Sequence, residues 1–171
     1  MLQKFRDYQP IIHEKAFIHP SSVIIGQVII DEGASIWPGV VLRGDMGVIK
    51  IGKNSSIQDN TVCHMTLDFS HTIVGENVTV GHGVILHGCI VEDDCLVGMG
   101  STILDQASIG KGSFVAAGSL VTGNKTFGEG SFIAGSPAKL IRPVNDRERL
   151  MCVSSVKHYL DLANAYLDQT H

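Results

Sequence analysis

The sequence has few charged residues and no excess of positive charge. Charged side chains make up 18% of the 171 residues and the formal net charge is −4, so no large basic surface for nucleic acid is expected. No apolar run approaches the roughly twenty residues that a membrane-spanning helix needs, so no contact with a membrane is expected. The first ten residues lack a secretory-signal profile, and we therefore expect a cytoplasmic protein.

Paired cysteines are also absent. The chain has four cysteines, and none of them forms a Cys-x-x-Cys pair or a disulfide framework, which agrees with a reducing compartment. The length leaves room for one main domain, and 44% hydrophobic residues are enough for a full core.

What the chain has instead is a repeat of six residues. Nineteen hexads open on an apolar residue, and their fifth residue is usually Ser, Ala or Thr. A period of six fits neither an ordinary helix nor a two-sided strand. It fits a coil of about eighteen residues with three short strands, in which the first residue of each hexad points inward. The hexads open at Ile18, Ile24, Ile30, Ile36, Leu42, Ile51, Ile57, Cys63, Val74, Val80, Leu86, Val91, Val97, Ile103, Ile109, Val115, Val121, Phe127 and Ile133.

The repeat predicts an all-β solenoid, a parallel β-helix over residues 1–142. Residues 143–171 are expected to form a C-terminal amphipathic α-helix, capped by Asn145 or Asp146. We expect this helix to pack on its own β-helix rather than only on another subunit. Its apolar stripe comprises Val153, Val156, Leu160, Ala163 and Leu167, widened by Cys152, Tyr159 and Tyr166.

The hexad repeat breaks in three places. The steps from Leu42, Cys63 and Leu86 to the next hexad are nine, eleven and five residues long. Insertions in a solenoid emerge on the surface and often carry function. The chemically suggestive side chains all lie within or beside these breaks.

Two histidines occupy equivalent positions on one face of the coil. His64 follows the hexad-opening Cys63, and His87 follows the hexad-opening Leu86. Both hexads supply the third face of consecutive coils, so the two imidazoles should stack about 4.8 Å apart, the strand spacing. They would then be close enough to share a metal ion.

His82 belongs to a different face. It is the third residue of the hexad that opens at Val80, which supplies the second face. It should therefore not reach an ion held by the other two histidines of its own chain. A neighbouring subunit could supply it, and three such heterologous contacts close a ring. The sequence thus predicts a homotrimer with metal sites at the subunit interfaces.

Three neutral imidazoles with an open fourth position are typical of catalytic zinc. Fe2+ or Co2+ would also suit these ligands. We therefore expect His64, His82 and His87 to bind Zn2+, or alternatively one of the other two ions.

Polar residues accompany the histidines in neighbouring coils. Asp59 has the same hexad position as His82, one coil earlier, and with Gln58 it could hydrogen-bond metal-bound water. Arg43 and Asp45 could form an ion pair that bridges subunits. The alternative is that these four are ordinary turn residues and surface charge.

These motifs together resemble one known family. Arg43-Gly44-Asp45, Gln58-Asp59, His64 and the segment Val80–Cys89 are similar to the γ-class carbonic anhydrases, in particular to their short bacterial relatives. The resemblance covers nearly the whole chain and implies that the β-helix is left-handed. It also implies a homotrimer that hydrates carbon dioxide reversibly to bicarbonate, because a bound divalent ion makes hydroxide available near pH 7.

The resemblance assigns roles to individual residues. It implies that the three histidines bind the metal and that Gln58 and Asp59 orient the attacking water and bicarbonate. Arg43 and Asp45 would tie subunits together, and Tyr159 would reach the site from the terminal helix.

The chain also departs from the best-studied members of that family. Met46 replaces a glutamate, and the insertion Met65–Thr72 lacks the acidic loop that supplies their proton-shuttle glutamate. Only Asp68 and His71 are ionisable there, and His71 could transfer protons because imidazole titrates near neutrality.

Two other functions remain open at this point. One is a non-catalytic, metal-binding trimer, which the missing shuttle loop favours. The other is a hexapeptide acyltransferase or acyl-CoA thioesterase, which shares the repeat but would not explain three phased histidines with Gln58 and Asp59.

Overall fold

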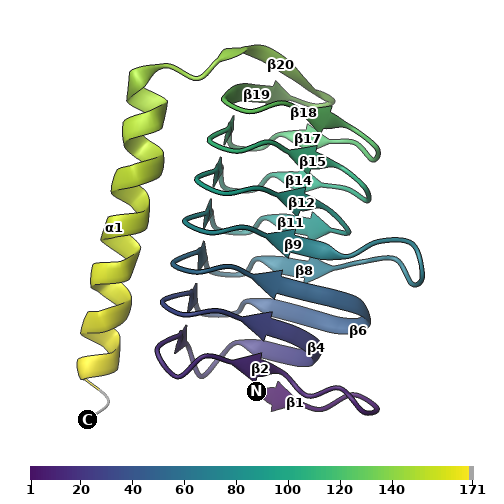
Figure 1. The fold of residues 1–171 in the computed structure, drawn as a ribbon, viewed down its shortest axis with the longest axis vertical. Coiled ribbons are helices and arrows are strands. Elements are labelled where there is room, and N and C mark those ends of the chain that lie inside the picture. The colour runs from purple at the N-terminus through teal and green to yellow at the C-terminus, as the bar shows by residue number, and fades with distance from the viewer. Residues whose placement is uncertain (170–171) are drawn as a thin grey trace.

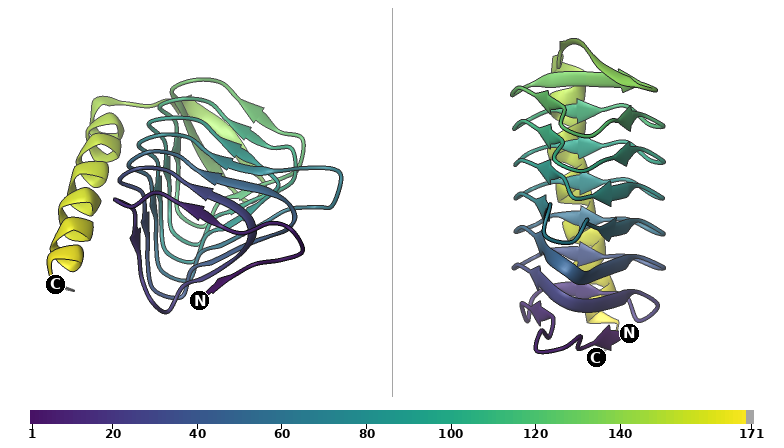
Figure 2. Two further views of the ribbon diagram at one scale, coloured as in Figure 1. Left: turned by 60° about the horizontal axis from the view of Figure 1, so that its bottom comes forward. Right: turned by 90° about the vertical axis from the view of Figure 1, so that its right-hand side faces the viewer.

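The chain winds into a stack of about seven triangular coils, with one long helix running along the outside (Figures 1 and 2). This computed structural model describes residues 1–169, so Thr170 and His171, the last two residues of the expected helical segment 143–171, lie outside it. Among residues 1–169, no helix combines the length and apolar character that crossing a membrane requires. The fold class predicted from the hexads, a parallel β-helix followed by a helix, is confirmed.

The strands form three faces, numbered here in the order in which the chain passes through the coil from Ile51 to His64. Strands β4 (Val23–Ile30) and β6 (Val41–Ile51) cross a corner, so they join the third face to the first face in one 12-stranded sheet. The first face also contains β2 (Ile11–Ile12), β9 (Thr72–Val74), β12 (Ile90–Val91), β15 (Ser108–Ile109) and β18 (Thr126–Phe127). The third face also contains β1 (Leu2–Gln3), β8 (Val62–His64), β11 (Ile85–His87), β14 (Thr102–Ile103) and β17 (Leu120–Val121).

The second face is a separate 8-stranded sheet, parallel except for its last strand, β20, which turns back antiparallel to β19. Its strands are β3 (Phe17–Ile18), β5 (Ser35–Ile36), β7 (Ser56–Ile57), β10 (Thr79–Val80), β13 (Leu96–Val97), β16 (Phe114–Val115), β19 (Ser131–Gly135) and β20 (Ala138–Pro143).

The core of the prism consists of the first residues of the hexads. All nineteen contribute to it: seventeen are buried, and the remaining two, Ile18 and Phe127, are partly buried and pack against the same cluster. Each fully buried aliphatic side chain stabilises the fold by about 1.5–3 kcal/mol. The inward phase predicted from the sequence is therefore confirmed along the whole repeat.

The small fifth residues lie at the corners, where their hydroxyls satisfy backbone groups of the next coil. Ser55 donates a hydrogen bond to the Gly75 carbonyl (2.7 Å) and accepts one from the Val78 amide (2.9 Å). Thr61 does the same with the Gly81 carbonyl and the Val84 amide. A larger residue would lose these bonds and would not fit the corner, which explains the preference for Ser and Thr.

The breaks in the repeat behave differently from one another. The nine-residue step after Leu42 is no loop, because β6 continues around the corner as one strand. The eleven-residue step is a loop between β8 and β9 that projects beyond the other coils (Figure 1). Its ends, Met65 and Thr72, are fully buried, so the loop is anchored at both sides.

Helix α1 (Asp146–Asp168) begins with a capping box, in which Asn145 and Glu148 bond reciprocally. It packs along the second face, where Ala163 lies in one cluster with Phe17 and Trp37. In this structure the helix therefore lies against the β-helix of its own chain. The expected stripe is wrong at Val153, which is 69% exposed. Tyr159 and Leu167 of that stripe pack against the cluster, together with Leu162, which the stripe did not include.

Candidate metal centre

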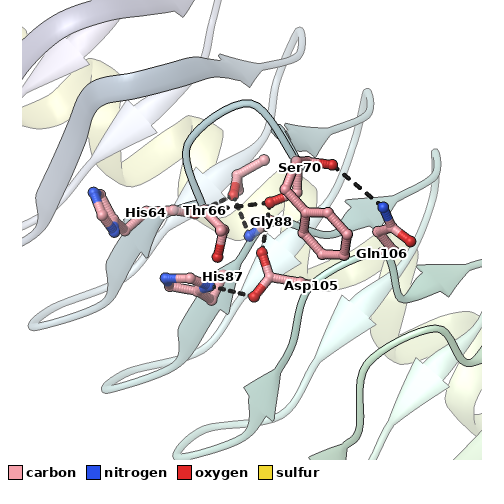
Figure 3. Close-up of polar contacts among 9 residues, drawn as sticks. His64, Thr66, Ser70, His87, Gly88, Asp105 and Gln106 are labelled. Atoms are coloured by element: carbon pink, nitrogen blue, oxygen red, sulfur yellow. Dashed lines mark hydrogen bonds and ion pairs between the residues drawn. The ribbon is translucent and has the colours of Figure 1, made fainter.

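His64 and His87 lie side by side on the outer surface of the third face. Strands β8 and β11 pair in parallel with His64 opposite His87, as the hexad register predicts. The two ring centroids are 5.4 Å apart, and Figure 3 shows both imidazoles projecting from the same side of the coil. The sequence therefore placed this pair correctly.

Arg43 and Asp45 join the same cluster. Strand β6 pairs with β8 so that Leu42 lies opposite Cys63, which brings the next residues of β6 close to His64. Asp45 accepts a hydrogen bond from His64 Nε2 (2.9 Å) through one oxygen and pairs with Arg43 (2.7 Å) through the other. This ion pair is formed within one chain; a role in bridging subunits stays a prediction.

The charge of Asp45 is fixed by these partners. Partial burial raises its pKa, but the hydrogen bonds from Arg43 and His64 and their charges outweigh burial, so the pKa is lowered overall. Asp45 is therefore a carboxylate at neutral pH and orients the His64 ring.

A second cluster lies on the second face, beneath helix α1. His82 Nδ1 contacts an Asp59 oxygen at 2.8 Å, across neighbouring coils, as expected from their common hexad position. Gln58, His82 and Tyr159 line a groove of about 240 Å³ between the sheet and the helix. Thr79 lines it too, and its buried hydroxyl has no hydrogen-bond partner among the described residues.

Tyr159 lines this groove from α1; its role at a metal site stays a prediction. Burial raises its pKa, and the nearby charge of Asp59 adds to that shift, while a hydrogen bond with Gln58 opposes it. The phenol is thus protonated at neutral pH. Together with the Gln58 amide, it offers the groove neutral hydrogen-bonding groups.

The predicted site residues therefore divide into two half-sites. Within residues 1–169 of one chain, no group of three or more His, Cys, Asp or Glu side chains is arranged to hold a metal ion. His82 lies on a different face from the stacked pair, as the sequence predicted. The division agrees with a site completed by a second chain.

The donor atoms fit a divalent metal ion. Asp59 and Asp105 contact the Nδ1 atoms of His82 and His87, respectively, and such carboxylate partners orient metal-ligating imidazoles so that Nε2 faces the ion. His64 is different, because its Nε2 contacts Asp45. It would have to exchange this contact for the metal.

Two functional candidates were missed from the sequence, Asp105 and Ser70. Asp105 accepts hydrogen bonds from both His87 and Ser70. The hexad register contains a signal for Asp105, since it lies on the third face one coil after His87 and in the adjacent hexad position. Nothing in the repeat places Ser70, because it belongs to the inserted loop.

The cysteines next to the histidines take no part in either half-site. Cys63 and Cys89 are fully buried in the core. Burial raises the pKa of both thiols, that of Cys89 to about 12. They are therefore protonated at neutral pH and poor metal ligands.

Comparison with known proteins gives the class first. The family model described as bacterial transferase hexapeptide (six repeats) matches residues 9–44, 71–105 and 88–123. A solved structure, a hexapeptide transferase family protein from Anaplasma phagocytophilum, superposes with a TM-score of 0.92 at 41% identity, covering 96% of this chain and 97% of that one. The chain belongs to the hexapeptide-repeat family.

Within this family, the γ-carbonic-anhydrase resemblance read from the motifs is confirmed. The chain is 42% identical over 95% of its length to gamma carbonic anhydrase 2, mitochondrial, of Arabidopsis thaliana. It is 44% identical over 93% of its length to the carnitine operon protein CaiE of Salmonella agona, covering 80% of that protein. The chain spans only 60% of the length of the plant relative.

Proposed function

We propose that this chain is the subunit of a metal-dependent carbonic anhydrase that hydrates carbon dioxide reversibly to bicarbonate. The observation that carries the proposal is the pair His64 and His87 on one face and His82 on another, each ring bonded to a carboxylate. Relatives named gamma carbonic anhydrase support this reaction class. The cytoplasm remains the expected compartment, although these relatives are named mitochondrial.

In the proposed assembly, three chains form a ring in which the third face of one chain meets the edge of the second face of the next that α1 leaves uncovered, where the His82 side chain is 48% exposed. Val62 and Ile85 are 37% and 43% exposed on the third face, in the strands that carry His64 and His87. Exposed apolar side chains around a polar cluster are typical of an interface. A second copy would cover them and supply His82.

The ion would be Zn2+, or alternatively Fe2+ or Co2+, and when bound it would supply activated water near neutral pH. Asp59 would hold the His82 ring through Nδ1 and leave Nε2 for the ion, whereas His64 would exchange its contact with Asp45 for the metal. The Gln58 amide and the Tyr159 hydroxyl, which line the same groove, would hold the oxygens of carbon dioxide and bicarbonate. Arg43 keeps Asp45 charged and in place.

The decisive measurement is stopped-flow carbon dioxide hydration by protein loaded with zinc, and separately with iron under anaerobic conditions. Wild type should turn over with one metal ion per chain, and His82→Ala should lose both metal and activity. Full metal without hydration would favour the non-catalytic trimer instead. Full metal retention by His82→Ala would refute the shared site.

Acyl transfer is the second candidate, because the Anaplasma phagocytophilum neighbour is named a hexapeptide transferase. Acyl-CoA turnover that survives removal of metal would favour it. The same assay separates an acyl-CoA thioesterase, which would release free CoA without an acceptor.

Proton transfer is the step for which the loop matters. His71 is exposed, and its Nδ1 accepts a hydrogen bond from the Val48 amide (3.2 Å), which leaves Nε2 facing away from that contact. If His71 is the shuttle, His71→Ala should lower turnover in dilute buffer and recover in concentrated imidazole. An unchanged rate in dilute buffer would rule the role out.

A further inference from the structure

The loop inserted between β8 and β9 is hydrogen-bonded to the strands that carry His64 and His87. Figure 3 shows its residues lying over these strands. The Thr72 hydroxyl donates to the His64 carbonyl (2.5 Å) and accepts from the Gly88 amide (2.9 Å). The loop thus ties together the backbones on which the stacked pair is mounted.

One polar chain leads from this loop to a histidine ring. Ser70 donates a hydrogen bond to one oxygen of Asp105 (2.5 Å), and the other oxygen lies 2.9 Å from His87 Nδ1. Ser70 is itself held by the Thr66 amide (3.2 Å). Gln106, beside Asp105, donates to the Phe69 carbonyl (3.3 Å). Both ends of the Ser70–Asp105 contact are therefore braced.

The backbone at Gly88 leaves the space that this contact needs. Gly88 has a positive φ of 63°, and a Cβ there would lie 2.1 Å from Ser70 Oγ and 2.2 Å from Asp105 Oδ1. Only glycine allows the loop to approach so closely. The close approach is thus specified by the residue directly after His87.

We propose that Asp105, held by Ser70, is a positioning residue that keeps His87 in the Nδ1–H form with Nε2 directed outward for the metal. The proposal rests on the proposed function, since it assigns the inserted loop to that site. In this proposal the loop supports the His87 ring through Ser70 and Asp105, and this role requires no ionisable residue in the loop itself. Neither Asp105 nor Ser70 touches the ion; both act through the ring.

The physical reason is tautomer selection. A neutral imidazole carries its proton on one nitrogen, and a carboxylate next to Nδ1 selects the form whose Nε2 lone pair is free. Removing such a partner typically lowers metal affinity by about 10- to 100-fold. Asparagine retains an acceptor oxygen but loses the charge, so it should have a smaller effect than alanine.

The first test measures zinc affinity by chelator competition and the visible spectrum of the Co2+ form. We expect Asp105→Ala to bind zinc about 10- to 100-fold more weakly, with Asp105→Asn and Ser70→Ala between it and wild type. The matched control is Asp93→Asn. Asp93 has the same hexad position, and its carboxylate bonds the Glu76 amide across coils but no histidine.

Asp93→Asn should leave zinc affinity and the Co2+ spectrum unchanged. Wild-type zinc affinity in Asp105→Ala would overturn the proposal. Thermal unfolding and oligomeric state are measured for every variant, and the isosteric Asp105→Asn keeps the test valid should the alanine variant misfold. An affinity loss confined to variants with altered assembly would also count against a positioning role.

The second test needs no metal, so it separates this proposal from the proposed function. Long-range nitrogen–proton NMR of the histidine rings, with His87 assigned by comparison with His87→Gln, should show Nδ1–H in metal-free wild type. Asp105→Ala should shift the ring toward Nε2–H. If this shift occurs but the wild type binds no zinc, the proposed metal-dependent function is wrong while the positioning of the His87 ring by Asp105 is supported. If Asp105→Ala leaves the tautomer of His87 unchanged, the positioning role is refuted.

Discussion

The shared site makes a quantitative prediction for mixtures of two inactive variants. The His82→Ala variant lacks the ligand on the second face, and the His87→Ala variant lacks one of the two ligands on the third face. A trimer made of either variant alone should therefore not bind metal tightly. A mixed trimer can still build a complete site wherever a His82→Ala chain presents its intact pair to the His82 of a His87→Ala neighbour. Such complementation is possible only between chains.

The expected yield follows from the geometry of a closed ring. With equal amounts and random assembly, the chain that supplies the third face is His82→Ala half of the time, and its neighbour is His87→Ala half of the time. About one quarter of the sites should therefore be complete. A site built within one chain would give none.

The assay is zinc content per chain after the two variants are refolded together, followed by carbon dioxide hydration of the same sample. A mixture of His64→Ala with His87→Ala is the matched control, because both changes damage the same half-site and no combination restores it. We expect about one quarter of wild-type zinc in the first mixture and none in the second. No recovery, once native mass spectrometry shows mixed trimers, would refute the shared site.

Three further predictions concern the scaffold. Thr61→Val should lower the free energy of unfolding, measured with urea, by about 1–3 kcal/mol, because the buried hydroxyl bonds two backbone groups. Thr79→Val should leave this free energy unchanged or raise it, because the Thr79 hydroxyl has no partner among the described residues. The bidentate bond to Arg142 lowers the pKa of Glu148 to about 2 from an ordinary 4.5. Glu148→Gln should therefore lower the urea midpoint at pH 7. The difference in midpoint between this variant and wild type should vanish as the pH falls from 4.5 to 2, where Glu148 of the wild type becomes protonated. Cys63, whose pKa burial raises, should react with a thiol reagent only after unfolding; rapid labelling of the native protein would contradict the packed core.

Most of the fold could be predicted because the repeat leaves little freedom. Inward residues must stack on their equivalents in the next coil, so a count of six residues determines both burial and register. That is why the hexad register pairs Leu42 with Cys63 and His64 with His87 once the extra residues of the two longer steps are set aside. The location of His82 on the second face, away from the other two histidines, follows from the same count.

The remainder depended on conformations that the repeat does not specify. The nine-residue step became a continuous strand, β6, which pairs with β4 on one side and with β8 and β9 on the other. Val153 belongs to an apolar helical stripe, but the buried side of the helix runs through Cys152, Tyr159 and Ala163 and leaves Val153 exposed. The contact of Ser70 with Asp105 depends on how the inserted loop folds back, which no hexad describes.

The prism also limits how its own side chains can meet. Outward groups on different faces of a convex coil diverge, so residues as distant in direction as His82 and His87 cannot converge on one atom outside it. Two prisms placed side by side can bring them together, and in the proposed assembly an ion that binds only this state would stabilise it by mass action. Because Asp59 and Asp105 orient their histidines within each chain, every subunit would bring ordered half-sites to this contact. Metal removal should therefore weaken the trimer while leaving each coil folded.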